Sequence, residues 1–408
     1  MSRRVCMLIY HYWPGPEGGT ERQCRRLATA LTRRGVVCTV LTTRSSRGVP
    51  VREQDDGVQI VRVPTVESFR RRPATSLHVA APVTASASPP ARSASAGIGH
   101  FAAATVAFLN ALVFQISAAA FLWRHSREFD LIHVHTAEWI AGFAVWIGRR
   151  LRLPVLCKLA TLPALPPTIS RVPFGKTWNQ MRRHAEFVAL NGAMAEELAA
   201  AGVPAQRIRV IPNSVGIPDV SLRHEDANTV LYVGNLSQGS YKAFDVLFDA
   251  WAMVHDVRPD GRLVVLGGGD ASPWERYLEE HGCRASVSFE GYVRDVDTYY
   301  ARAAMLVLPS RQEGMSNALL EALSWGIPAV VSDIPANRAV VVDGQNGLVV
   351  PVNNAAALAA GIIRLLGDAG LRNLLGVTAR RRIRERYGVE RVAEQTQKVY
   401  DGLQFVSG

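Results

Sequence analysis

The chain has 408 residues, of which 48% are hydrophobic and 20% charged, a composition typical of a globular protein with roughly two or three domains. Its formal net charge of +11 would attract polyanions such as anionic lipid or phosphorylated substrates. The basic residues stand in small groups, without a long basic arm, zinc-finger spacing or an RNA-reading motif, so we expect no nucleic-acid partner.

Cysteine usage and the N-terminal segment predict a cytoplasmic protein. The five cysteines are scattered and form no C-x-x-C pair, which fits a reducing compartment where they act as small core residues. The first apolar run stops at Pro14 and has no small-residue cleavage site, so we expect no signal peptide.

The N-terminal segment reads as a strand, a loop, a helix and a second strand. The apolar run Val5–Tyr10 fits a buried parallel strand, and a glycine-rich loop follows from Pro14 to Gly19. Thr20 and Gln23 have capping-box spacing, which predicts the start of a helix that ends near Gly35. With a strand at 36–43, this unit is the seed of a doubly wound sheet.

The segment from 82 to 123 is harder to assign. Residues 82–99 are rich in Pro, Ala and Ser and predict a loop or a disordered insertion. Phe101 to Trp123 contains no charged residue, and Arg124 and Arg127 follow it. The pattern fits a buried or half-buried core helix or a helix in the membrane interface, and fits a membrane-spanning helix less well.

Strand and helix patterns alternate through the rest of the chain, with a pause in a polar stretch near 213–227. The strands expected beyond the first unit lie at 131–135, 154–159, 187–190, 209–211, 229–234, 263–266, 287–290, 305–308, 329–332 and 347–350, and a last helix at about 389–405. We therefore predict an α/β protein with two Rossmann-like doubly wound domains that face each other across a cleft. The predicted boundaries are 1–213, 214–386 and a C-terminal helix over 387–408 that packs back toward the first domain.

The strongest local signal runs from Leu308 to Ala322. A strand ends at Leu308, Gly314 lets the backbone approach a ligand, and Ser316 can cap a helix whose free N–H groups suit a diphosphate. Glu313 lies in the loop and Glu321 lies one turn into the helix, where it could accept hydrogen bonds from ribose hydroxyls. From these residues alone, Glu313 could equally be a solvated loop acid, and Glu321 could equally be an exposed helix acid, with no part in a site.

Two glutamates separated by seven residues, between Pro-Ser and Ala-x-x-x-Gly-x-Pro, resemble the signature of glycosyltransferase family 4. The resemblance continues through 343–351, 10–35 and 130–135 and leaves out about 65–125. It implies a GT-B fold and a retaining glycosyltransferase that takes a sugar from a nucleotide diphosphate donor of the UDP or GDP type.

The resemblance also implies roles for individual residues. Glu313, His135 and Lys242 would be catalytic: Glu313 near the reacting centre of the sugar, His135 at the end of its strand, and Lys242 on the diphosphate. The implied nucleotide-sugar-binding residues are Gly18, Gly19, Asn235, Lys242, Gly291, Tyr292, Val293, Gly314, Met315, Ser316, Asn317 and Glu321. His133 and His135 point to one face of a strand and could suggest a metal pair, but no third ligand is evident, so we expect no metal and no cofactor.

One departure from the family concerns the diphosphate clamp. Asn235 stands where the family usually carries Arg, the spacing to Lys242 is one residue longer, and Ala243 replaces the usual Gly. The missing cation could be supplied by Arg311 or Lys158, and the sequence does not choose between them.

The expected function is transfer of a hexose-type sugar to an acceptor hydroxyl on a lipid-linked sugar, glycan or small molecule, as in cell-surface polysaccharide, glycolipid or glycosylated-metabolite synthesis. The protein would be cytoplasmic, with peripheral membrane contact as an open alternative. The rival functions are a sugar phosphorylase or nucleotide-sugar hydrolase on the same fold, or a non-catalytic nucleotide-sugar-binding protein.

Overall fold

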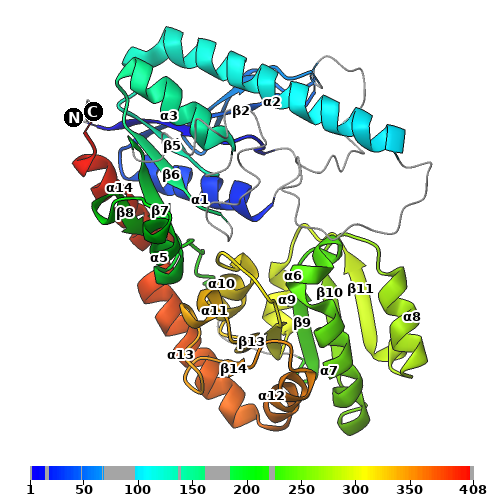
Figure 1. The fold of residues 1–408 in the computed structure, drawn as a ribbon. Helices are drawn as coiled ribbons and strands as arrows, with labels where there is room; N and C mark the ends of the chain where they lie inside the picture. The colour runs from blue at the N-terminus through cyan, green and yellow to red at the C-terminus, as the bar shows by residue number, and fades with distance from the viewer. Residues whose placement is uncertain are drawn as a thin grey trace. The chain divides into compact units, whose positions relative to one another are not determined.

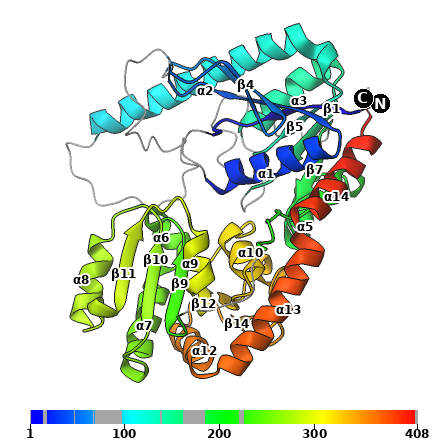
Figure 2. The ribbon, with the colours of Figure 1, turned by 180° about the vertical axis from the view of Figure 1, so that it is seen from behind.

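The computed structural model describes residues 2–13, 18–46, 48–66, 68, 97–136, 139–160, 184–219 and 226–404. The loop predicted at 82–99 lies outside these ranges except for its last three residues. The chain divides into two compact units, unit 1 with Met1–Ile211 and Val392–Gly408, and unit 2 with Pro212–Arg391. Each is an α/β unit built on a largely parallel sheet (Figures 1 and 2), as the sequence predicts for two Rossmann-like domains.

Unit 1 contains an eight-stranded sheet in the order β3-β4-β2-β1-β5-β6-β7-β8, in which only the β3–β4 pair is antiparallel. Its strands are β1 (Arg4–Leu8), β2 (Val37–Thr43), β3 (Arg52–Asp55), β4 (Val58–Val63), β5 (Leu131–Val134), β6 (Val155–Lys158), β7 (Glu186–Ala189) and β8 (Ile208–Val210). All four residues of β5 and of β6 are buried, because helices cover both faces of a parallel sheet.

Helices flank this sheet on two sides, with α2 and α3 over one face and α1 over the other (Figures 1 and 2). The helices are α1 (Gly19–Arg33), α2 (Gly97–His125), α3 (Trp139–Leu151), α5 (Gly192–Ala200) and α14 (Val389–Gly402), with short 3-10 turns η2 (Ser126–Glu128) and η5 (Ala205–Arg207). Most of α14 belongs to unit 1 although it ends the chain. Arg34 donates to Gln397 at 2.9 Å, and Arg3 donates to the carbonyl of Asp401 at 2.9 Å, so this helix is tied to α1 and to the start of β1.

One local prediction in unit 1 was wrong, and one element was missed. The N-cap of α1 is Gly18, without a side-chain cap, so Thr20 lies inside the first turn and does not form the predicted capping box. The β3–β4 hairpin was not predicted, although its two-residue turn carries a clear signal. Asp56 and Gly57 both have positive φ, at 47° and 81°, which is the backbone that favours Asp-Gly in tight hairpins.

Helix α2 is half buried. Asn110, Phe114 and Ala118 are at most 3% exposed, whereas Ile116 and Trp123 are 61% and 64% exposed. The structure thus agrees with the half-buried helix that was one interpretation of 101–123. Among the described residues, no helix combines the length and apolar character needed to cross a membrane.

Unit 2 contains a six-stranded, fully parallel sheet in the order β11-β10-β9-β12-β13-β14. Its strands are β9 (Thr229–Val233), β10 (Arg262–Leu266), β11 (Val287–Gly291), β12 (Met305–Leu308), β13 (Ala329–Ser332) and β14 (Leu348–Val350). Its helices are α6 (Gly239–Lys242), α7 (Phe244–Val257), α8 (Ser272–Glu280), α9 (Asp297–Arg302), α10 (Asn317–Ser324), α11 (Pro335–Arg338), α12 (Ala355–Gly367) and α13 (Ala369–Tyr387), with 3-10 turns η6 (Leu236–Gln238) and η7 (Arg284–Ser286).

The glycine run 267–269 has a packing role in this unit. A Cβ on Gly267 would come within 1.9 Å of the carbonyl oxygen of Gly234, and one on Gly269 within 2.8 Å of the backbone nitrogen of Ser237. Leu236 also donates to the carbonyl of Gly268 at 2.8 Å. The glycines therefore seat the loop after β9, the same loop that leads to Lys242.

Candidate active site

Glu313 lies in the loop between β12 and α10 and is held by two donors. Lys242 Nζ donates to Glu313 Oε1 at 2.6 Å, and Ser310 Oγ donates to the same oxygen at 2.8 Å. The side chains of Lys242 and Glu313 are only 16% and 11% exposed, so Glu313 is not a solvated loop acid. This half-buried pair places a cation and a carboxylate together at the carboxyl edge of the sheet, where ligands bind in α/β folds.

The loop from β9 positions Lys242. The lysine ends the short helix α6, and Ala243 then takes a left-handed backbone conformation with φ 53°. A glycine would adopt this conformation without strain, whereas an alanine does so at some cost. Asn235 is exposed, and its Oδ1 accepts a hydrogen bond from the backbone of Ser237 at 2.8 Å, so this side chain caps its own loop.

Arg311 does not offer a free replacement for the missing clamp arginine. Its guanidinium makes a two-pronged contact with Asp245, at 2.9 and 2.5 Å, and donates to Asn353 at 2.6 Å. The hydrogen bonds and charge of Arg311 hold the pKa of the Asp245 carboxyl below its usual value despite partial burial. Arg311 is thus committed to binding together the loop after β12 and the start of α7.

The beginning of α10 has the geometry expected from the sequence. Ser316 is its N-cap, and its hydroxyl accepts from the backbone of Leu319 at 3.3 Å. Asn213 supports this turn, because its backbone donates to the sulfur of Met315 at 3.3 Å and its side chain donates to Asn317 at 3.1 Å. Gly314, before this turn, is buried.

Glu321 is buried within α10, at 8% exposed, so it is not an exposed helix acid. The hydroxyl of Tyr300, which is fully buried in α9, donates to Glu321 Oε2 at 3.3 Å. Gly291 ends β11 with φ 67°, and after it Tyr292 is 59% exposed, while Val293 is partly buried.

In unit 1, Gly18 is the N-cap of α1 and Gly19 is its first residue. His135 directly follows β5, and its backbone donates to the carbonyl of Leu8 at 3.1 Å. Its ring is 1% exposed, and neither ring nitrogen has a hydrogen-bond partner within the described residues. The ring of His133 lies against it, with centroids 4.3 Å apart.

Burial determines the charge of these side chains. It lowers the pKa of His133 to about 3, and together with the charges of His133 and Lys158 it lowers the pKa of His135 well below the usual 6.5. Lys158 ends β6 and is 6% exposed, and burial lowers its pKa to about 8. Both imidazoles are therefore neutral near pH 7, each able to donate one hydrogen bond and accept another.

Comparison with known proteins identifies the family. A glycosyl transferase 4-like domain matches residues 18–214, and a glycosyl transferases group 1 domain matches residues 227–368. The chain belongs to the family 4 type of GT-B glycosyltransferases.

Relatives and solved structures agree along the whole length of this glycosyltransferase. It is 26% identical to a D-inositol 3-phosphate glycosyltransferase of Xylanimonas cellulosilytica, with 97% of this chain and 96% of that protein covered. The fold matches sucrose-phosphate synthase from Thermosynechococcus elongatus with a TM-score of 0.73, at 20% identity and 98% coverage of both chains. It also matches Anabaena HepE in complex with UDP-glucose, with a TM-score of 0.71, at 17% identity and 98% and 100% coverage.

The structure of the glycosyltransferase brings together Glu313, Lys242 and the start of α10 in unit 2, and His135 with Lys158 in unit 1. Across the described ranges, no group of three or more His, Cys, Asp or Glu side chains is placed to hold a metal ion. The predicted roles of the site residues and the independence from metal remain predictions.

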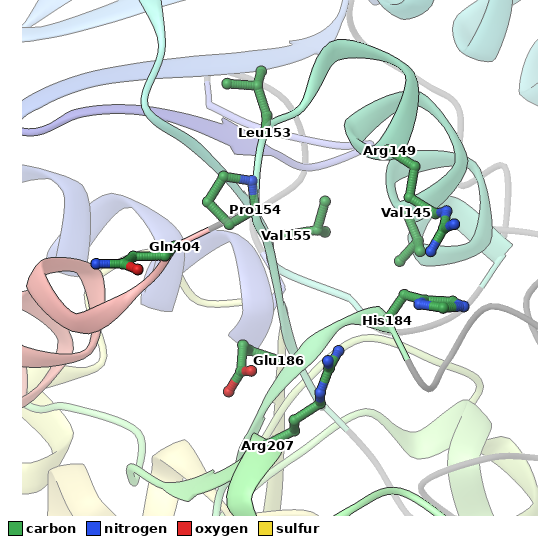
Figure 3. A pocket seen from close by; sticks show the side chains of 9 residues that line it. All are labelled: Val145, Arg149, Leu153, Pro154, Val155, His184, Glu186, Arg207 and Gln404. Carbon is green, nitrogen blue, oxygen red and sulfur yellow. The ribbon is translucent and has the colours of Figure 1, made fainter. Parts of the chain in front are cut away.

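A pocket of unit 1 lies at the amino ends of β6 and β7, whereas Lys158 lies at the carboxyl end of β6 (Figure 3). The residues that line this pocket include Val155 at the start of β6, Glu186 at the start of β7, and the basic side chains of Arg149, His184 and Arg207. Strand β6 runs from this pocket to Lys158, so the pocket is separate from the residues near His135.

Sequence reasoning did not single out the residues that hold the predicted site residues in place. These are Asn213, Tyr300 and Tyr400, whose contacts with Met315, Glu321 and His133 connect segments far apart in the sequence. No local pattern in the glycosyltransferase sequence indicates such contacts. Ser310 could have been predicted as a partner of Glu313, because it stands three residues before it in the motif at 308–322.

Proposed function

We propose that the protein is a retaining glycosyltransferase that moves a hexose-type sugar from a UDP- or GDP-sugar to an acceptor hydroxyl on a lipid-linked sugar, glycan or small molecule. The observation that carries this proposal is the pair of Lys242 and Glu313, 2.6 Å apart and half buried, in the loops that lead to α7 and α10. The inositol phosphate named for a relative and the UDP-glucose held by HepE support a phosphorylated or sugar-like acceptor and a nucleotide-sugar donor.

Lys242 would exchange its partner when the donor binds. The ammonium of Lys242 is compensated by the carboxylate of Glu313. A diphosphate carries more negative charge than one carboxylate, so it would draw Lys242 away and leave Glu313 to accept hydrogen bonds from hydroxyls of the donor sugar. The start of α10, with Ser316 as its N-cap, offers backbone N–H groups to the same diphosphate.

The reaction breaks the bond between the anomeric carbon and the phosphate oxygen, and the bonding electrons stay on that oxygen. Lys242 and the helix dipole stabilise the negative charge that develops there. The acceptor hydroxyl attacks from the face that the phosphate leaves, and its proton passes to the leaving phosphate oxygen, so the anomeric configuration is retained. These protein groups supply the stabilisation without a metal ion.

Glu321 and His135 would complete the contacts. Glu321 is buried and held by Tyr300, so its carboxylate presents a fixed acceptor to the ribose hydroxyls of the nucleotide. His135 would use a neutral imidazole to hydrogen-bond the reacting sugar, because burial keeps its pKa well below the usual value.

Peripheral contact with a membrane also belongs to this proposal. Phe108, Leu109, Ile116 and Trp123 form an exposed apolar row on α2, between 41% and 64% exposed, and the exposed Arg124 follows it. A row of this kind, with a tryptophan and an arginine at one end, suits the interface of an anionic lipid layer. A lipid-linked acceptor would then be presented at that surface.

A donor screen followed by product analysis tests the function. Thermal shifts with UDP-glucose, UDP-galactose, UDP-N-acetylglucosamine and GDP-mannose identify the donor, and proton NMR of the product gives its anomeric configuration. We expect release of a nucleoside diphosphate that depends on an added acceptor, and an α-linked product from an α-linked donor. Inversion would refute the retaining mechanism. Transfer only to phosphate or water would support the phosphorylase or hydrolase, and binding without release would support a non-catalytic protein.

A further inference from the structure

The orientation of His135 has an unusual origin. A catalytic imidazole needs a fixed ring, and in most active sites a hydrogen bond to the second ring nitrogen fixes it. Within the described residues, both ring nitrogens of His135 lack such a partner. The ring instead packs against that of His133, with centroids 4.3 Å apart and planes tilted by 33°. The orientation of His135 therefore depends on the ring beneath it.

The ring of His133 is fixed in turn by Tyr400. His133 is fully buried, and its Nδ1 lies 2.6 Å from the Tyr400 hydroxyl. If the hydroxyl donates, only the Nε2–H of His133 remains without a partner. If Nδ1–H donates, both the Nε2 acceptor and the tyrosine proton remain without one. Because unpaired buried polar groups are costly, the first arrangement is favoured, and His133 then carries its proton on Nε2.

Tyr400 itself is firmly placed. It lies in α14 and is fully buried, and this burial raises its pKa well above 10.0. Contacts at Gln397 and Asp401 tie α14 down on both sides of it. The hydroxyl thus remains protonated and keeps one position.

We propose that Tyr400 and His133 are positioning residues, through which the C-terminal helix fixes the ring of His135 for sugar transfer. The helix that ends the chain thereby controls the orientation of an imidazole more than 250 residues earlier in the sequence, since Tyr400 and His133 are 267 residues apart. The catalytic consequence rests on the proposed function, whereas the geometric claim stands on unit 1 alone.

The test compares Tyr400→Phe with Tyr387→Phe. Tyr387 is a matched control, because it is also a buried tyrosine whose hydroxyl donates at 2.6 Å, to the carbonyl of Ala339 in unit 2. Each variant loses one hydroxyl and one hydrogen bond. Two readouts are used: kcat and KM with the donor found in the screen, and the ¹⁵N imidazole signals of His133 and His135 in histidine-labelled protein.

We expect Tyr400→Phe to lower kcat about three- to tenfold with an unchanged donor KM, which corresponds to one lost hydrogen bond. The ¹⁵N signals of both histidines should shift or broaden. Tyr387→Phe should change neither readout, even if both variants melt at lower temperature. Unchanged imidazole signals in Tyr400→Phe would overturn the proposal, and so would altered signals with an unchanged kcat. If the wild type transfers no sugar, the proposed function fails, and the ¹⁵N signals still decide the positioning claim.

Discussion

The predicted site residues of the two units differ in whether their side chains have partners inside the protein. In unit 2, Glu313 is satisfied by Lys242 and Ser310, and Arg311 by Asp245, so the charges compensate one another inside the protein. In unit 1, His135 is buried with no hydrogen-bond partner among the described residues. Unit 2 must therefore break an internal ion pair to bind a charged ligand. In unit 1, the neutral ring of His135 can bind a ligand without breaking a hydrogen bond to the described residues.

The largest effect should come from removing the carboxylate of unit 2. Glu313→Gln keeps the size of the side chain and removes its charge, so Lys242 loses its anionic partner and the sugar loses a charged acceptor. We expect kcat to fall about 10²–10³-fold, as for loss of one electrostatic contact to a transition state. Steady-state release of nucleoside diphosphate measures it.

The matched control is Glu394→Gln, because Glu394 pairs with Lys398 at 2.7 Å on the exposed side of α14. Exposed pairs contribute little, so this variant should keep wild-type turnover. Equal turnover in the two variants would show that the Lys242–Glu313 pair has no part in catalysis.

Removing the cation of the same pair should have the next largest effect. Lys242→Ala takes one charge-assisted contact from the diphosphate, which costs about 1.5–3 kcal/mol, or roughly ten- to hundredfold in kcat/KM. Lys398→Ala serves as the control and should leave kcat/KM unchanged. A value for Lys242→Ala within about twofold of wild type would mean that the diphosphate does not rest on this lysine.

The buried imidazoles of unit 1 should make stability depend on acid pH. The pKa of His133 is about 3 and that of His135 lies well below 6.5 in the folded protein, whereas the unfolded chain titrates near 6.5. Below pH 6.5 the unfolded chain therefore binds more protons, and stability falls as pH drops toward 3. For His133 the loss approaches roughly a tenfold change in the unfolding equilibrium per pH unit, and His135 acts in the same direction.

Urea denaturation at pH 7.5, 6 and 5 measures this loss. In His133→Gln the free energy of unfolding should depend less steeply on pH, because one titrating group has been removed. A stability that is flat between pH 6.5 and 5 would show that the two rings are accessible to water and protons.

The exposed apolar surfaces give the smallest expected effect and again contrast the units. The double variant Ile116→Ser and Trp123→Ser should weaken binding to vesicles of phosphatidylcholine and phosphatidylglycerol at least about tenfold, or roughly 1.4 kcal/mol. Leu374 and Val377 of α13 are similarly exposed, at 65% and 55%, and their replacement by Ser should not change vesicle binding. Equal losses would indicate nonspecific adsorption, and no wild-type binding would refute the membrane contact.

The sequence predicted the fold well because the signals are local. Runs such as Met305–Leu308 and Ala329–Ser332 are buried on both faces and read directly as parallel strands. Strand β3 was missed because it is an edge strand made of four polar residues. None of them is buried, so the sequence shows no apolar run there. Helix α2 was ambiguous because its apolar residues lie on both its buried and its exposed faces.

The site residues could be proposed from the motif at 308–322, but their interactions could not. That Arg311 is bound to Asp245, and that Lys242 is bound to Glu313, depends on loops from β9 and β12 meeting at one sheet edge. The same holds for Tyr400 and His133. Such pairs are set by tertiary packing, which residue spacing does not encode.

The exchange of partners by Lys242 is the central claim, and UDP and GDP binding to Glu313→Gln tests it most directly. Isothermal titration with whichever nucleotide binds the wild type should show an affinity for Glu313→Gln that is about three- to tenfold higher, because the diphosphate no longer competes with an internal carboxylate for Lys242. The same variant should be nearly inactive in transfer. An affinity equal to or weaker than that of the wild type would contradict the exchange of partners by Lys242.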